Sequence, residues 1–396
     1  MKPIHPWKLT FAGLGALAVA IGIGRFLLTP MLPVMQRAQG LDLLTAGSLA
    51  AATNIGYLLG ALSCTALRIS SERLIRLGIA LVGLFTLAMA ATREPTLWLL
   101  LRGLTGIASA WIMVHTAALI TPQLHRSGRS QLDGVMYAGT GTGIVITGAL
   151  VPLLATHTEP AALWLMFGAA SLLVLACVWP ALGSAPTAHG SAAKTAGSAF
   201  PPGALAFIVT YGLIGFGYSI PATFLPLIAR QLLQRPDLAD AMWPLYGVAA
   251  ALTTIGLPHL ATRYRSTNRL LLIGCQLAMI VGSGACLVSA SIGGVLIAAI
   301  LNGSVLMAVV MLTMREAHRI APARATLLMA LLTSAFGLGQ IIGPFCAGYV
   351  AHATGNFRGA LLMAVAMLAL GIGFTLLSMR NSGGESLAAN EPAVEK

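Results

Sequence analysis

Long apolar segments alternate with short polar segments along almost the whole chain. A helix needs about 20 apolar residues to cross the hydrocarbon core of a bilayer, and twelve segments meet this requirement. They cover residues 9–35, 45–67, 74–92, 96–120, 132–155, 161–182, 202–229, 240–261, 269–289, 291–314, 325–351 and 357–379. The first segment is longer than the apolar core of a cleaved signal peptide, so we expect it to be retained. The pattern predicts an all-α integral membrane protein with twelve transmembrane helices.

Composition and charge agree with this prediction and add an orientation. The chain is 57% hydrophobic and 9% charged, with a mean hydropathy of +0.86, whereas soluble domains carry about 25% charged residues. The net charge of +12 does not indicate nucleic-acid binding, because the cations lie in short segments between the spans and form no basic stripe. Sixteen of the 23 Lys and Arg residues fall on the side of the N-terminus, five on the other side and two within spans. The positive-inside rule therefore places both termini in the cytoplasm.

The segment "GSAPTAHGSAAKTAGSAFPPG", residues 183–203, interrupts the series of apolar segments at its midpoint. Its content of Ser, Ala, Gly and Pro is typical of a flexible linker. We therefore expect an N-terminal six-helix bundle, a cytoplasmic linker, a C-terminal six-helix bundle and a cytoplasmic tail. Their boundaries are 1–182, 183–201, 202–380 and 381–396.

The two halves repeat each other. The stretch "GIGRFLLTPMLPVMQR" (22–37) aligns without a gap with "GFGYSIPATFLPLIAR" (215–230), and five positions are identical. Two further sets of glycines match in the same order, in the second and eighth spans and in the fifth and eleventh. Two parallel repeats of this kind are typical of secondary transporters, which bind their solute near the midplane between the halves.

Several motifs resemble those of the major facilitator superfamily. "RGLTGIASA" (102–110) resembles its arginine–glycine motif, and "GTGTGIVITGALVP" (139–152) and "GLGQIIGPFCAG" (337–348) resemble its glycine–proline motif. The loop at 60–76 matches the signature between spans two and three only in part, since the usual aspartate and second glycine are missing. "GIGRFLLTPMLP" (22–33) resembles the bacterial YbfB/YjiJ-like branch. The resemblance covers nearly the whole chain and implies a monomeric carrier of the bacterial inner membrane that works by alternating access.

Arg25 lies inside the first apolar segment, where a charge costs roughly 2.5–3.5 kcal/mol on insertion scales. We find no Asp or Glu in the middle of any span, and the nearest is Asp133 at the inner end of span five. Arg25 could bond backbone carbonyls freed near Pro30 and Pro33, or extend to the interface. Our prediction is instead that it faces the central cavity and binds an anionic group, because a guanidinium fork suits a carboxylate or phosphate.

Arg102 lies at a similar depth in span four, and two interpretations of it stay open. Two cations at one level favour an anionic solute. The alternative is that Arg102 corresponds to the structural arginine of the superfamily and bonds helix backbone.

Further polar side chains are candidates for binding or coupling. Tyr218 occupies the repeat position of Arg25, and Tyr211 shares its helix face because it lies seven residues earlier; core packing is the alternative for both. Secondary candidates, which could also serve only as contacts between helices, are Asn54, Tyr57, Tyr137, Asn302 and Gln340. The candidates for proton coupling are Asp133 and His115, although the spacing of His115 from Arg102 favours a packed or interfacial histidine.

Other classes of function lack sequence support. We find no HExxH, no paired carboxylates and no GxSxG, which argues against an enzyme, and the five cysteines form no CxxC or metal cluster. "GTGTG" (139–143) lies inside an apolar span, so it does not predict a phosphate loop, and we expect no cofactor. The sequence predicts a secondary transporter for a small solute, with an organic anion as the favoured class. The alternative is a multidrug or metabolite efflux carrier, with or without proton coupling.

Overall fold

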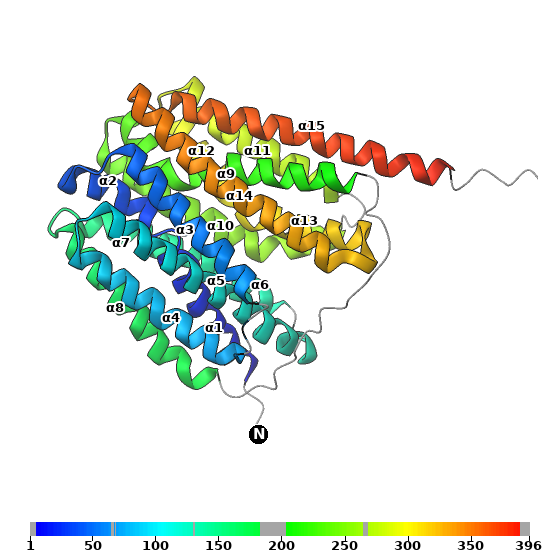
Figure 1. Ribbon diagram of the computed structural model, residues 1–396, viewed down its shortest axis with the longest axis horizontal. Coiled ribbons are helices and arrows are strands. Elements are labelled where there is room, and N and C mark those ends of the chain that lie inside the picture. Colours follow the sequence, from blue (N-terminus) through cyan, green and yellow to red (C-terminus); the bar gives the residue numbers. More distant parts are fainter. Residues whose placement is uncertain are drawn as a thin grey trace, which may run out of the picture.

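The computed structural model describes residues 5–64, 67, 69–129, 131–182, 203–263 and 268–388, and helices dominate this part of the chain (Figure 1). The helices are α1 (Pro6–Leu17), η1 (Ala18–Ile23), α2 (Leu28–Gln39), α3 (Leu43–Ser63), α4 (Ser71–Ala88), η2 (Met89–Ala91), α5 (Pro95–Arg126), α6 (Leu132–Tyr137), α7 (Gly139–Leu154), α8 (Pro160–Val178), η3 (Trp179–Ala181), α9 (Ala204–Leu233), α10 (Pro236–Arg263), α11 (Asn268–Val288), α12 (Ile292–Ser304), α13 (Leu306–Ile320), η4 (Pro322–Arg324), α14 (Ala325–Thr354) and α15 (Arg358–Ala388). Here η1 is a π-helical segment, and η2, η3 and η4 are short 3₁₀ turns.

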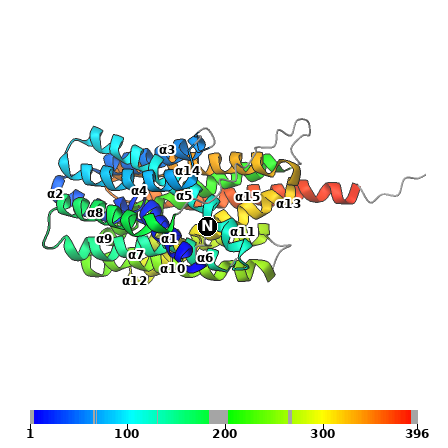
Figure 2. The ribbon, with the colours of Figure 1, turned by 90° about the horizontal axis from the view of Figure 1, so that it is seen from below.

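These helices form twelve candidate membrane spans in the described part of the chain, which confirms the predicted number. Some spans combine several helical elements. The first span, Pro6–Gln39, contains α1, η1 and α2, and the tenth, Ile292–Ile320, contains α12 and α13. Figure 2 shows that the helices of the whole molecule run along one long axis. Length and apolar composition were sufficient for this prediction, because crossing a bilayer requires little else of a helix.

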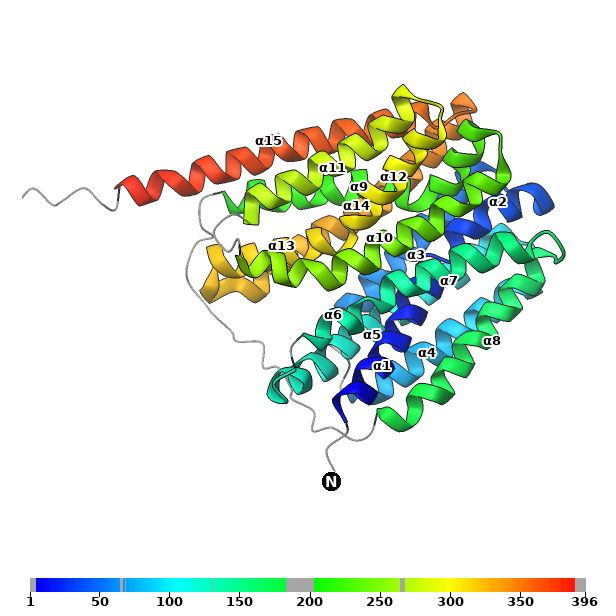
Figure 3. The same ribbon diagram turned by 180° about the vertical axis from the view of Figure 1, so that it is seen from behind.

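The helices lie in two groups, α1–α8 and α9–α15, which occupy different sides of the molecule in Figures 1 and 3. Contacts between the groups are made by α3 with α14, by α7 with α10 and by α2 with α9. The starts of α1 and α9 and the ends of η3 and α15 lie toward the end of the molecule opposite to α2. Residues 183–202, which include the predicted linker, lie outside the described residues. Helix α15 continues to Ala388, beyond the predicted start of the tail at residue 381.

Glycines allow the two groups to approach closely. A Cβ atom at Gly47 on α3 would lie 3.1 Å from the Cα atom of Gly348 on α14 and would clash with the carbonyl oxygen of Pro344. On α7, a Cβ atom at Gly141 would lie 2.6 Å from the carbonyl oxygen of Gly247 on α10. Small residues let helix backbones pack at short distance inside a membrane. The glycine-rich stretches of spans five and eleven therefore lie at the contact between the groups.

Candidate functional site

The first span is broken at its centre. At η1, backbone amides donate to the carbonyl five residues earlier. Gly24 N donates to Val19 O at 2.8 Å, and Phe26 N donates to Ile21 O at 2.9 Å. Pro30 has no N–H group for the Phe26 carbonyl, and the Thr29 amide bonds to that carbonyl instead, at 3.1 Å. Because the Thr29 amide bonds to the Phe26 carbonyl, it does not bond to the Arg25 carbonyl. In the described structure, no backbone amide donates to the carbonyl oxygens of Gly24 and Arg25. Such π-helical bulges occur frequently at functional sites.

Arg102 on α5 fills this break. Its side chain is fully buried, and its Nη2 donates to the carbonyl oxygens of Gly24 at 2.6 Å and Arg25 at 3.2 Å. Its Nε donates to the Thr53 hydroxyl at 3.1 Å. These bonds fit the interpretation of Arg102 as a backbone-binding arginine. They also show that Arg102, and not Arg25, bonds the carbonyls left free before Pro30.

The side chain of Arg25 is only partly buried and makes different contacts. Its Nη2 donates to Asn54 Oδ1 at 2.8 Å and to Gln340 Oε1 at 3.2 Å. Its guanidinium lies 4.4 Å from the centre of the Tyr57 ring, a cation–π contact. Asn54 Nδ2 donates to the backbone oxygen of Gln340 at 2.7 Å, so α3 and α14 are joined at the same place. Among the residues that the structure describes, no carboxylate pairs with Arg25.

A small cavity of about 30 Å³ adjoins this arginine. Four predicted site residues line it: Arg25, Asn54, Tyr218 and Gln340. The other residues that line it are Phe26, Leu28, Thr29, Ala50, Thr53, Ser219, Ala222 and Thr223. Sequence reasoning missed Thr223, because five residues rotate a helix by about 140° and spacing alone does not place it beside Tyr218. The cavity receives residues from both groups of helices, α2 and α3 on one side and α9 and α14 on the other.

Tyr218, which lines the cavity, belongs to an aromatic cluster on the C-terminal group of helices. Tyr211 and Tyr218 are buried on α9, and both stack on Phe336 of α14, with ring centres 4.5 and 6.2 Å apart. The hydroxyl of Tyr246 donates to that of Tyr218 at 3.2 Å, and Tyr246 stacks on Trp243. Tyr211 thus lies behind Phe336 and does not line the cavity. Phe336 was missed, although it lies four residues before Gln340 and so shares its helix face.

The remaining candidates lie apart from the cavity. Asn302 is buried in α12 and donates to the Ala298 carbonyl of its own helix. Tyr137 is partly buried at the end of α6 and packs on the apolar core. His115 is packed on α5, where its Nδ1 lies 3.1 Å from the Ser71 hydroxyl of α4. The Asp133 carboxylate at the start of α6 lies 2.6 Å from His125 Nε2 at the end of α5.

A buried carboxylate near the end of span ten was not predicted from the sequence. Helix α13 extends span ten to Ile320, beyond the predicted end at residue 314, and the Glu316 side chain is only 2% exposed. Arg269 on α11 lies 2.5 Å from this carboxylate and Arg319 lies 2.7 Å from it. Because a charged partner on another helix compensates Glu316, the helix stays buried where the apolar pattern ends.

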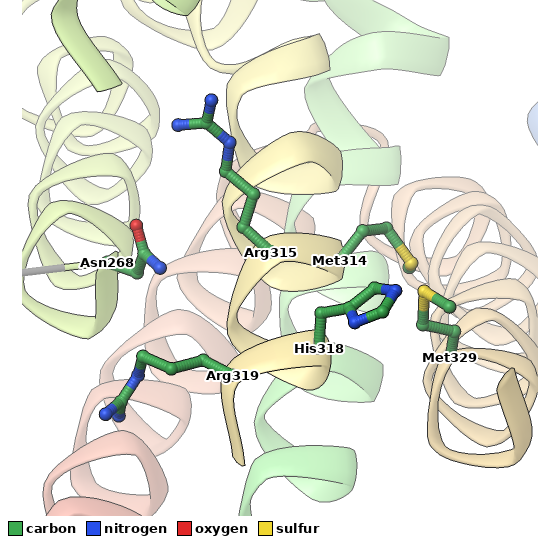
Figure 4. Close-up of a pocket in the computed structure, with 6 residues that line it drawn as sticks. All are labelled: Asn268, Met314, Arg315, His318, Arg319 and Met329. Atoms are coloured by element: carbon green, nitrogen blue, oxygen red, sulfur yellow. The ribbon is translucent and has the colours of Figure 1, made fainter. Parts of the chain in front are cut away.

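A cavity of about 660 Å³ also lies in this region. The residues that line it lie on α11, α13 and α14 (Figure 4): Asn268, Met314, Arg315, His318, Arg319 and Met329. None of them is a predicted site residue, and all belong to the C-terminal group of helices. The cavity beside Arg25 is the better candidate for a solute site, because both groups of helices contribute to it.

The twelve-span fold is that of the major facilitator superfamily, and solved structures agree. A mutant of the nucleoside transporter NupG is 14% identical, with a TM-score of 0.76 over 94% of this chain and 99% of that one. A bacterial homologue of the human lysosomal transporter Spinster, in an inward-facing and occupied conformation, is 14% identical, with a TM-score of 0.72 over 96% of this chain and 98% of that one. At this identity both show the fold alone.

The chain belongs to the family described as "Uncharacterised MFS-type transporter YbfB", whose model matches residues 17–376. A comparison with curated proteins found no match. Membership of this family makes the protein a multi-pass membrane transporter of a small solute and not an enzyme. This family agrees with the resemblance that residues 22–33 indicate.

Proposed function

We propose that the protein is a secondary transporter that carries a small organic anion across the bacterial inner membrane, as a monomer with both termini in the cytoplasm. The observation that carries this proposal is the environment of Arg25. Its charge faces a cavity between the two groups of helices and is held by neutral oxygens and a Tyr57 ring.

The energetics of Arg25 support an anionic solute. A central arginine costs roughly 2.5–3.5 kcal/mol on insertion scales. A cation–π contact contributes about 0.5–2 kcal/mol and offsets this cost in part. A carboxylate at the guanidinium would form charge-assisted hydrogen bonds, about twice as strong as neutral ones. The site therefore favours an anion because it has a cation without a counter-charge of its own among the described residues.

The same contacts connect solute binding to the arrangement of the helices. Arg25 and Asn54 belong to the N-terminal group, whereas Gln340 belongs to the C-terminal group. A carboxylate on Arg25 would compete with Gln340 Oε1, so the bond between the groups would change when the solute binds. A ligand shifts a conformational equilibrium only through such differential contacts. This competition supports alternating access by movement of one group against the other.

The contacts near α2 support a conformation that is closed on the outer side. The groups touch near α2, where the Thr29 hydroxyl donates to the Ala222 carbonyl at 3.1 Å. With the termini in the cytoplasm, the closed end is the outer one.

Multidrug transport is supported less well. A carrier of lipophilic cations requires an apolar site without fixed positive charge, whereas Arg25 and other polar side chains line this cavity. The charges of Arg25 and Arg102 would also repel a cation.

The test is ligand-induced stabilisation of the purified transporter in detergent, with a panel of short carboxylates and with tetraphenylphosphonium as the lipophilic cation. We expect at least one carboxylate to raise the melting temperature of the wild type and of the control Arg358→Gln, whose arginine is exposed. Arg25→Gln should lose this response. Stabilisation by tetraphenylphosphonium and by none of the carboxylates would contradict the proposal and favour multidrug transport.

A further inference from the structure

Two layers of side chains follow each other along the contact between α3 and α14. The first is polar and contains Arg25, Asn54 and Gln340. The second is aromatic and contains Tyr57 and Phe336, which lie three residues after Asn54 and four residues before Gln340. Because α3 and α14 run in opposite directions, with Gly47 near Pro344 and Leu58 near Gly337, both steps lead the same way along the contact. One helical turn, about 5.4 Å, separates the layers.

The aromatic layer is rigid on the side of α14. Phe336 is stacked at 4.5 Å and 22° on Tyr211, which is 1% exposed, and it also stacks on Tyr218, which is 2% exposed. Phe336 itself is only partly buried. Tyr211 therefore supports it from behind, Tyr218 supports it from the side of the cavity, and part of its surface stays free. On α3, Tyr57 is also partly buried and lies against the Arg25 guanidinium.

We propose that the solute is an aromatic carboxylate, whose carboxylate binds Arg25 in the polar layer while its ring packs on Phe336 and Tyr57 in the aromatic layer. This inference rests on the proposed transport of an organic anion and adds the chemical class of the solute. A flat ring suits this place because aromatic pairs gain affinity beyond the area that they bury. A saturated ring of the same size buries similar area but has no π-system to stack.

The test compares benzoate with cyclohexanecarboxylate at neutral pH. The two probes have the same charge and the same number of heavy atoms, and they differ in whether the ring is aromatic. Affinity is measured by thermal stabilisation in detergent for the wild type, Phe336→Leu and Phe345→Leu. Phe345 is a matched control, because it lies on the same helix and is 48% exposed.

We expect the wild type to bind benzoate roughly 2- to 12-fold more tightly than cyclohexanecarboxylate, the range that an aromatic pair contributes. Phe336→Leu should bring this ratio close to one, whereas Phe345→Leu should keep it. Equal affinity of the wild type for the two probes would overturn the inference, and this comparison does not depend on the folding of any variant. A preference that survives in Phe336→Leu would overturn it as well.

The outcome also separates this inference from the proposed function. If neither ring compound binds but an aliphatic carboxylate of the panel does, the aromatic solute is excluded and anion transport stands. If no carboxylate of any kind binds, the proposed function fails and the inference fails with it.

Discussion

Replacement of Glu316 by Gln should destabilise the transporter strongly, although the residue lies outside the candidate solute site. The carboxylate is 2% exposed and its partner Arg269 is 5% exposed, so neither charge can be solvated if the other is removed. Breaking a buried ion pair by removing one partner costs about 3–5 kcal/mol. Arg319, which also contacts the carboxylate, is 53% exposed and can return to water, so its lost contact adds little.

The assay is the free energy of unfolding in mixed detergent, measured for the wild type, Glu316→Gln and the control Asp237→Asn. Asp237 pairs with Arg235, but the two side chains are 62% and 64% exposed, so this variant should retain the stability of the wild type. The double variant Glu316→Leu with Arg269→Met should recover much of the loss, because apolar residues often replace a buried ion pair without cost. If Glu316→Gln were as stable as Asp237→Asn, the buried pair would not hold α11 and α13 together and the reasoning would be refuted.

Four further predictions follow from the helix contacts and the topology. Arg102→Gln should destabilise the protein by about 1–3 kcal/mol for each of the two carbonyls that lose a donor; lost carboxylate affinity at unchanged stability would instead make Arg102 a solute ligand. Gly47→Leu should force α3 away from α14 and raise the labelling of cysteines placed at the outer end of the contact, whereas unchanged labelling would show that this contact does not close the outer side. Asp133→Asn removes the pair with His125 and should weaken any pH dependence of transport; a folded variant with the pH profile of the wild type would exclude Asp133 from coupling. A cysteine at position 198, outside the described residues, should resist an impermeant reagent added to intact cells, and reaction with it would reverse the assigned topology.

The sequence was most informative where one property of one segment decides the structure. Twelve spans could be predicted because a bilayer demands length and apolar composition from each helix separately. The alignment of residues 22–37 with 215–230 also placed Tyr218 opposite Arg25, and the structure brings both to one cavity. Such patterns need no knowledge of which helices touch.

Contacts between distant helices were beyond the sequence. Asn54 and Gln340 could be predicted only as secondary candidates, because their bonds to Arg25 depend on how α3 and α14 cross. The carbonyls that Arg102 binds become free only through the π-helical break in span one, which has no periodic signal. Glu316 was missed because Arg269, 47 residues away in the chain, makes its burial possible.

Affinity for the most tightly bound carboxylate of the panel, measured beside thermal stability for Arg25, Arg25→Lys and Arg25→Gln, tests the central claim most directly. Lysine keeps the charge without the guanidinium fork, so binding should weaken. Glutamine should lower the affinity roughly 10- to 150-fold, the equivalent of one lost hydrogen bond to a charged group. Its melting temperature without ligand should stay near that of the wild type, because Asn54 and Gln340 can still bond to each other. If Arg25→Gln binds the carboxylate with the affinity of the wild type, or fails to fold, Arg25 is a structural residue and the claim that it binds an anionic solute is contradicted.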